Sequence, residues 1–134
     1  MTEVRHVDHV QLPIPIGGAP RARAFYEHAL GLRELRDPAL DRPGTLRFSI
    51  GWQRLDLTEG VYTGIAPQAH LALAVSDAAG LATRLRRAGF LVDDSLLFYR
   101  RRIYAEDPFG NRLELLESEA GVGLQEVAGL QLAI

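Results

Sequence analysis

The chain has 134 residues, 47% of them apolar and 24% charged, and a formal net charge of −2, which is the composition of one globular domain with a real core. It contains no cysteine and no lysine, because all 15 basic residues are arginine. Disulfides, thiolate nucleophiles, cysteine zinc sites and Schiff-base chemistry are therefore excluded.

The same composition limits the partners and the location of the protein. The arginines are dispersed apart from the run Arg100 to Arg102, which argues against nucleic-acid binding. No apolar run approaches the length of a membrane span, and the charged, alternating N-terminus does not have the pattern of a signal peptide. We therefore expect a cytoplasmic protein with neither a nucleic-acid nor a membrane partner.

The first half of the chain predicts one strand, one helix and three further strands. In ARAFYEHALG the apolar residues recur at helical spacing, with Pro20 near the expected start and Gly31 just past the end. Alternating patterns predict the four strands. They are expected at about Val4–Ile14, Arg33–Leu35, Leu46–Ile50 and Gln53–Thr58.

The second half predicts the same order of elements. The helix is expected in SDAAGLATRLRRAG, where Ser76 or Asp77 can cap the start and Gly89 the end. The turn residues DPFGN join the last two strands. The four strands are expected at about His70–Val75, Leu91–Asp93, Arg101–Ala105 and Arg112–Glu117.

An internal repeat relates the two halves. QRLDLTE, from Gln53, aligns with NRLELLE, from Asn111, so that Asp56 matches Glu114. Asp56 follows His9 by 47 residues, and Glu114 follows His70 by 44. The predicted fold is therefore α+β, with two tandem βαβββ modules in a single domain, 1–134. Module one covers about 4–60, module two about 68–117, and a C-terminal tail covers 118–134.

Strand alternation places the matched polar residues on the face opposite the helices. Taken alone, Glu114 between Leu113 and Leu115 is ordinary alternation of buried and solvent-facing residues. If each sheet curls, however, these residues line a cleft, where two histidines and a carboxylate are typical of an open divalent-metal site. Arg54 and Arg112 are expected on this face, together with the candidate site residues His9, Gln11, Asp56, His70, Arg100, Arg102, Tyr104 and Glu114.

Four segments, VDHVQL, ARAFYEHALGL, HLALAV and YAEDPFGNRLELLE, resemble the vicinal oxygen chelate superfamily. This family includes glyoxalase I, fosfomycin-modifying enzymes, extradiol dioxygenases, methylmalonyl-CoA epimerase and bleomycin-resistance proteins. The resemblance implies metal ligation by His9, His70 and Glu114. Asp56 occupies the place where glyoxalase I has a fourth ligand, Glu or Gln, and aspartate is one methylene shorter.

The resemblance leads us to expect a metal-dependent lyase, isomerase or dioxygenase. It would bind one divalent ion (Fe, Mn, Ni, Zn or Co) and a small anionic substrate with vicinal oxygens. Asp56 and Tyr104 are the candidate catalytic residues. Arg102, Arg100 and Gln11 are the candidate substrate-binding residues, although the arginines can equally be a solvated charge run at a strand end.

Two further expectations come from the same resemblance. One is a homodimer with its sites between modules, in which the first-strand histidine of one chain joins the other two ligands of its partner. The other is the alternative function of a metal-free or inactive protein that binds a small molecule or antibiotic, as bleomycin-resistance proteins do. The presence of His9, His70 and Glu114 favours the enzyme.

Overall fold

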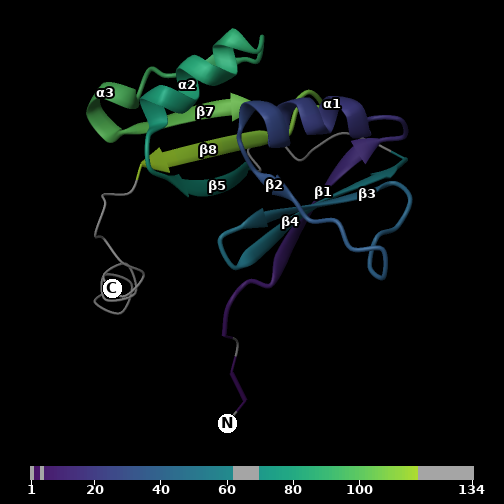
Figure 1. Ribbon diagram of the computed structural model, residues 1–134. Helices are drawn as coiled ribbons and strands as arrows, with labels where there is room; N and C mark the ends of the chain where they lie inside the picture. The colour runs from purple at the N-terminus through teal and green to yellow at the C-terminus, as the bar shows by residue number, and fades with distance from the viewer. Residues whose placement is uncertain (1, 4, 62–69, 118–134) are drawn as a thin grey trace.

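The computed structural model describes residues 2–3, 5–61 and 70–117, which form two consecutive βαβββ modules (Figure 1). Module one contains β1 (His9–Pro15), α1 (Ala19–Arg23), its π-helical continuation η1 (Ala24–Ala29), β2 (Arg33–Glu34), β3 (Thr45–Ile50) and β4 (Gln53–Gly60). Module two contains β5 (His70–Val75), α2 (Ala78–Arg87), β6 (Val92–Asp93), α3 (Leu97–Arg100), β7 (Arg102–Glu106) and β8 (Arg112–Glu117). The predicted α+β class is confirmed, and the predicted tail lies outside the described residues.

Each module has its own four-stranded mixed sheet, with α1 over the first and α2 over the second (Figure 1). The strand orders are β1-β4-β3-β2 and β5-β8-β7-β6. In both sheets the first strand of the module pairs in parallel with the last, and the other pairs are antiparallel. Within the described residues, β1 and β5 are therefore edge strands.

The strand register confirms the predicted repeat. Gln11 lies opposite Asp56, and Ala72 lies opposite Glu114. In each case the histidine stands two residues earlier on the same strand, so His9 and His70 occupy equivalent positions. The two halves thus agree residue by residue around the two acids.

Some predicted boundaries are wrong. The first strand begins at His9, which pairs with Arg54 next to the start of β4 at Gln53, so residues before Asp8 have no β4 residue opposite them. The helix α3 was not predicted, and it ends at Arg101 in the left-handed conformation, with φ of 51°. Because of this reversal, the alternation of β7 does not extend back to Arg100.

The helices begin and end as the sequence indicates, with one difference in their winding. Asp77 caps α2 by accepting a hydrogen bond from the Gly80 amide (2.9 Å), and Gly31 follows the first helix with φ of 87°. The first helix widens into a π turn, where the amide of Leu30 donates to the carbonyl of Phe25 (2.8 Å). The wider turn buries the adjacent side chains of Phe25 and Tyr26 together.

One continuous apolar core joins both modules. The strand residues predicted to face the helices, Leu55, Leu57, Leu113 and Leu115, are all fully buried. Each such leucine contributes roughly 1.5–3 kcal/mol by burial. Burial of these leucines therefore places the polar residues that alternate with them on the face opposite the helices.

The last residue of each repeated segment, Glu59 of QRLDLTE and Glu117 of NRLELLE, binds the start of the helix of its own module. The Glu59 carboxylate accepts from the amides of Gly17 and Ala19 at the start of α1 (3.2 and 3.3 Å). Glu117 accepts from the amide of Ala78 at the start of α2 (3.3 Å). The repeated Glu is thus a helix cap that satisfies exposed N–H groups.

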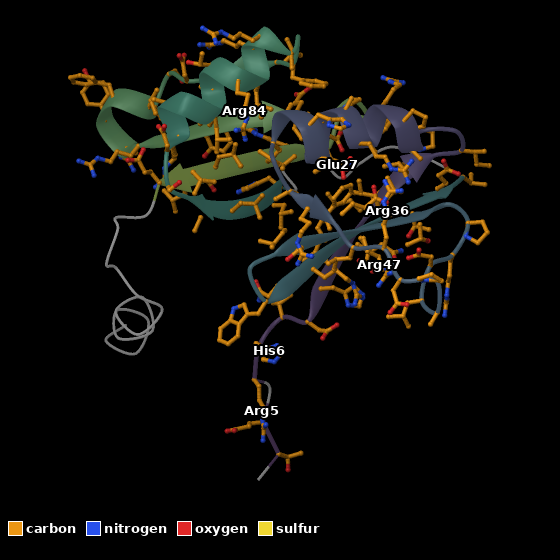
Figure 2. The ribbon with its side chains drawn as sticks, in the orientation of Figure 1. Arg5, His6, Glu27, Arg36, Arg47 and Arg84 are labelled. Carbon is orange, nitrogen blue, oxygen red and sulfur yellow. The ribbon has the colours of Figure 1, made fainter. Side chains whose placement is uncertain are left out.

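Polar contacts also tie module one to module two. The buried hydroxyl of Tyr26 donates to Asp107 (2.7 Å), and the Asn111 amide group donates to Asp107 (2.8 Å) and to the Pro13 carbonyl (3.3 Å). Arg84 of α2 donates to the carbonyls of Ala29 and Leu30 at the end of the first helix (2.7 and 3.0 Å; Figure 2). These contacts fix how the modules pack.

Candidate functional site

Glu114 is the centre of a polar cluster on the non-helix face of the second sheet. Arg102 Nη1 donates to Glu114 Oε1 (2.7 Å), and the Tyr104 hydroxyl donates to the same oxygen (3.3 Å). The other oxygen, Oε2, lies 3.3 Å from His70 Nε2. Although Glu114 is on the face opposite the helix, its neighbours leave it only 7% exposed.

This cluster fits two ligands of a divalent ion. Two ligand atoms that each lie about 2.1 Å from one ion stand about 3.0–3.4 Å apart at octahedral or tetrahedral angles, which matches the Nε2–Oε2 separation of 3.3 Å. Arg102 and Tyr104 engage only Oε1, so they orient the carboxylate and leave Oε2 beside the histidine. Hydrogen bonds of this kind typically fix a ligand's direction.

The equivalent acid of module one is held differently. Arg54 donates to both oxygens of Asp56, from Nε to Oδ1 (2.6 Å) and from Nη2 to Oδ2 (3.1 Å). The hydrogen bond with Asp56 is also the main reason that the pKa of Arg54 is raised above its usual value. A guanidinium that binds both oxygens neutralises the charge of Asp56 and occupies one acceptor site on each oxygen.

His9 lies on the same face as Asp56, next to an exposed acid. Its Nδ1 is 2.8 Å from Asp8 Oδ2, and this hydrogen bond is the main cause of a lowered pKa at Asp8. Such a carboxylate orients the imidazole. Gln11, two residues along β1, is exposed on this face.

The predicted metal ligands are brought together only in part. His70 and Glu114 are adjacent on the second sheet, whereas His9 belongs to the first. In the described ranges, no three His, Asp or Glu side chains gather closely enough to hold an ion. Arg100 lies on α3, exposed, and no hydrogen bond joins its side chain to the Glu114 cluster.

Two arginines in contact with these residues were not among the sequence candidates. The Arg112 guanidinium stacks on the Tyr104 ring, 4.3 Å from its centre, and Arg54 covers Asp56. Both occupy the same place in the repeat, as the Arg of QRLDLTE and NRLELLE. That shared position was the signal that could have identified them.

Comparison with known proteins settles the family. The sequence profile of the Glyoxalase/Bleomycin resistance protein/Dioxygenase superfamily matches residues 6–115. The chain belongs to this superfamily. No curated protein gives a significant match to the chain.

Several solved structures have the same fold as this chain. A protein described as a glyoxalase family member, from Bacillus anthracis, is 32% identical over 88% of this chain and 98% of its own, with a TM-score of 0.76. The fosfomycin resistance protein FosX from Mesorhizobium loti is 18% identical over 95% and 99%, with a TM-score of 0.67. TnmS3, an antibiotic-binding protein from Streptomyces sp. CB03234, is 22% identical over 87% and 98%, with a TM-score of 0.65.

Membership of the superfamily is consistent with both predicted functions, an enzyme and a small-molecule-binding protein. Its name covers glyoxalases, dioxygenases and bleomycin resistance proteins, so it contains both enzymes and small-molecule binders. Its members typically use a divalent metal. None of the described helices is long and apolar enough to cross a membrane.

Proposed function

We propose that the protein is a metal-dependent lyase, isomerase or dioxygenase that acts on a small anionic substrate with vicinal oxygens. The observation that carries this proposal is the pair formed by His70 Nε2 and Glu114 Oε2, 3.3 Å apart, with the other carboxylate oxygen held by Arg102 and Tyr104. His9 is the third ligand in the proposal, because the repeat makes it the equivalent of His70.

The donor set of two imidazoles and one carboxylate suits Fe, Mn, Ni, Zn or Co. When bound, the ion would supply a Lewis acid with open positions for two neighbouring substrate oxygens. The protein's own contribution is orientation. Arg102 and Tyr104 keep Glu114 turned toward His70, and Asp8 keeps the His9 ring in place.

The remaining candidates keep distinct roles in the proposal. Gln11 projects from β1 two residues from His9, where its amide can bind a substrate oxygen. Arg102 has donors besides the Nη1 that binds Glu114, and these can meet a substrate anion. Arg100, on the exposed helix α3, would contribute charge at the edge of the site.

The proton-transfer role of Asp56 is opposed by a neighbouring charge. Both of its oxygens accept hydrogen bonds from the Arg54 guanidinium, which favours the ionised form, so protonation of Asp56 must weaken this ion pair. Tyr104, whose hydroxyl makes a long 3.3 Å contact with Glu114, is the other candidate for moving a proton.

We further propose that the site is completed by a second copy of the chain in a homodimer. His9 lies on one sheet and the His70–Glu114 pair on the other, and β1 and β5 are both edge strands in the described part of the chain. In this arrangement His9 of one subunit meets His70 and Glu114 of its partner, which gives two equivalent sites per dimer.

Subunit mixing tests both proposals together. His9→Ala and Glu114→Ala proteins should each lose high-affinity binding of Zn²⁺ or Mn²⁺ in calorimetry. If the two are mixed and allowed to exchange, about a quarter of the sites become intact, because half the dimers are mixed and each has one complete site. Mixing His70→Ala with Glu114→Ala is the matched control. It should restore nothing, since both residues come from one subunit.

The possible outcomes distinguish an error in the dimer proposal from an error in the metal proposal. No recovery in the first mixture, with high-affinity binding by the wild type, would place all three ligands in one chain. No binding of any first-row metal by the wild type would favour the alternative of a metal-free small-molecule-binding protein. That alternative is supported by the absence of a three-ligand cluster among the described residues.

A further inference from the structure

A pocket of about 390 Å³ opens on the non-helix face of the first sheet. Its walls come from β1, β3, β4 and the loop that precedes β3. The charged residues that line it are three arginines, Arg42, Arg47 and Arg54, and one acid, Asp56. This pocket contains none of the residues of the Glu114 cluster.

The charges in the pocket do not cancel. Arg54 is neutralised by Asp56, which it binds through two hydrogen bonds. Arg47 is neutralised by Asp41 of the adjoining loop, with Nη2 2.6 Å from Oδ1. No hydrogen bond or ion pair engages the Arg42 side chain within the described residues. The pocket therefore has one surplus cation, which suits an anionic ligand.

Asp41 occupies a place that another carboxylate could take. The side chain of Arg47, which projects from β3 and is labelled in Figure 2, is only 12% exposed, whereas that of Asp41, on the loop before β3, is 47% exposed. The Asp37 amide, and after it Arg47, lowers the pKa of Asp41, so the loop acid stays ionised. A half-exposed ion pair of this kind is held weakly and can be exchanged for a ligand anion.

The pocket is placed to bind one end of a molecule whose other end lies at His9. Gln11, Asp56 and Arg47 form one row across three adjacent strands, which spans about 10 Å. His9 lies two residues before Gln11 on the same face, about 7 Å along the strand. Leu40, which is 59% exposed at the pocket, gives an apolar wall for the part of the molecule between the two ends.

We propose that this pocket, with Arg42 and Arg47 as its cations, binds a carboxylate or phosphonate of the substrate, remote from the vicinal oxygens. That the ligand is a substrate rests on the proposed function. Binding of the anion itself does not, because the pocket is formed by one module and needs no metal. The anion of the substrate thus docks on the first sheet and displaces Asp41 from Arg47.

Titration of metal-free protein tests the pocket by itself. After treatment with chelator, succinate should bind and shift the NMR amide signals of Gln11, Thr45 and Thr58, whereas the uncharged succinamide should not. Arg42→Gln and Arg47→Gln should each weaken succinate binding about tenfold, because each removes a charge-assisted contact. Arg87→Gln, an exposed arginine at the end of α2, is the matched control and should change nothing.

Asp41→Asn separates ligand binding from a structural role of the loop. Asparagine keeps the side-chain oxygen that accepts from the Asp37 amide but removes the competing charge. Succinate should therefore bind about fivefold more tightly. Absence of succinate binding to metal-free wild type, an Arg47→Gln protein that binds like Arg87→Gln, or no gain with Asp41→Asn would each overturn the inference. The subunit-mixing experiment tests the metal site independently, so failure of one proposal does not decide the other.

Discussion

The two modules have the same strands in the same register, yet their two acids have opposite surroundings. Glu114 divides its oxygens, one to Arg102 and Tyr104 and one toward His70. Asp56 gives both of its oxygens to Arg54. The repeat therefore fixes where a carboxylate stands but not what it can bind. One oxygen of the module-two acid lies beside a histidine, whereas both oxygens of the module-one acid bind a neighbouring arginine.

The last hairpin of each module differs in the same way. In module one, Gly51 and Trp52 alone connect β3 to β4, and Trp52 is 84% exposed. In module two, the five residues 107–111 connect β7 to β8, and they bury Asp107 against Tyr26. The two turns therefore differ in function, because among the described residues hydrogen bonds to the other module are found for the second turn and not for the first.

Replacement of each acid by its amide should give the largest difference between the two modules. Glu114→Gln should weaken binding of a first-row divalent ion by at least about 100-fold, because it removes the charge beside His70. Asp56→Asn should change affinity less than about threefold. Calorimetry with chelator-treated protein measures both, and equal losses in the two variants would contradict the assignment of one acid to the metal.

Replacement of the buried acid in the module-two turn should have the next largest effect. Asp107→Ala leaves the Tyr26 hydroxyl and the amides of Phe109 and Asn111 without their acceptor. We expect a loss of about 3 kcal/mol in the free energy of unfolding, measured with urea. Asp93→Ala is the control, since this exposed acid also accepts a backbone amide, and it should cost under about 1 kcal/mol.

Removal of the Tyr26 hydroxyl should have a smaller effect that depends on pH. Burial first, and then the Asp107 carboxylate, raise the pKa of Tyr26 well above its usual value near 10. Above pH 10 the folded protein therefore keeps a proton on Tyr26 that the unfolded chain loses. The contribution of this group to the free energy of unfolding is fully present below pH 10 and falls as the pH rises further. Tyr26→Phe should cost about 1 kcal/mol at pH 7.

The pH dependence supplies the control for that measurement. Above pH 10, the unfolding free energy of Tyr26→Phe should fall less steeply than that of the wild type. Tyr99→Phe, at an exposed position, should keep the wild-type slope. If Tyr26→Phe kept that slope as well, another group would be responsible for the alkaline loss.

The smallest expected effect concerns the hydroxyl that helps to orient Glu114. Tyr104→Phe removes a 3.3 Å hydrogen bond but leaves the shorter one from Arg102. Metal affinity should fall about threefold, less than the roughly 10-fold or greater loss typical of such supporting contacts, because the Arg102 bond still orients the carboxylate. A loss as large as that of Glu114→Gln would instead indicate that Tyr104 contacts the ion.

The fold could be predicted almost completely from the sequence, because it depends on periodic patterns. The alternation around Leu55 and Leu113 fixed the faces, and the matched acids fixed the register of the two modules. Helix α3 was missed, since four residues carry too little periodicity to distinguish them from a strand end. Arg100 therefore lies on this helix, and the strand alternation that assigned its face does not apply to it.

For the candidate site, the sequence could predict on which face of the sheet each residue lies but not which side chains bind one another. Alternation put Asp56 and Glu114 on the non-helix face, where both are found. It could not indicate that Arg54 would bind both oxygens of Asp56 while Arg102 binds one oxygen of Glu114, because side-chain pairing within a face depends on rotamers and local packing. Nor could it separate one chain's contribution to the site from that of a second copy.

In each module, we expect the strand that is synthesised first to be the last to join the sheet. Strands β3 and β4 are joined by a short turn and can pair within microseconds. Strand β1 must wait for β4, which follows it by the length of a helix and two strands, before their parallel pairing can form. During synthesis, therefore, the segment that carries His9 has no strand to pair with until the whole first module has emerged. We expect this late docking of an edge strand to be the step most open to misassembly between nascent chains.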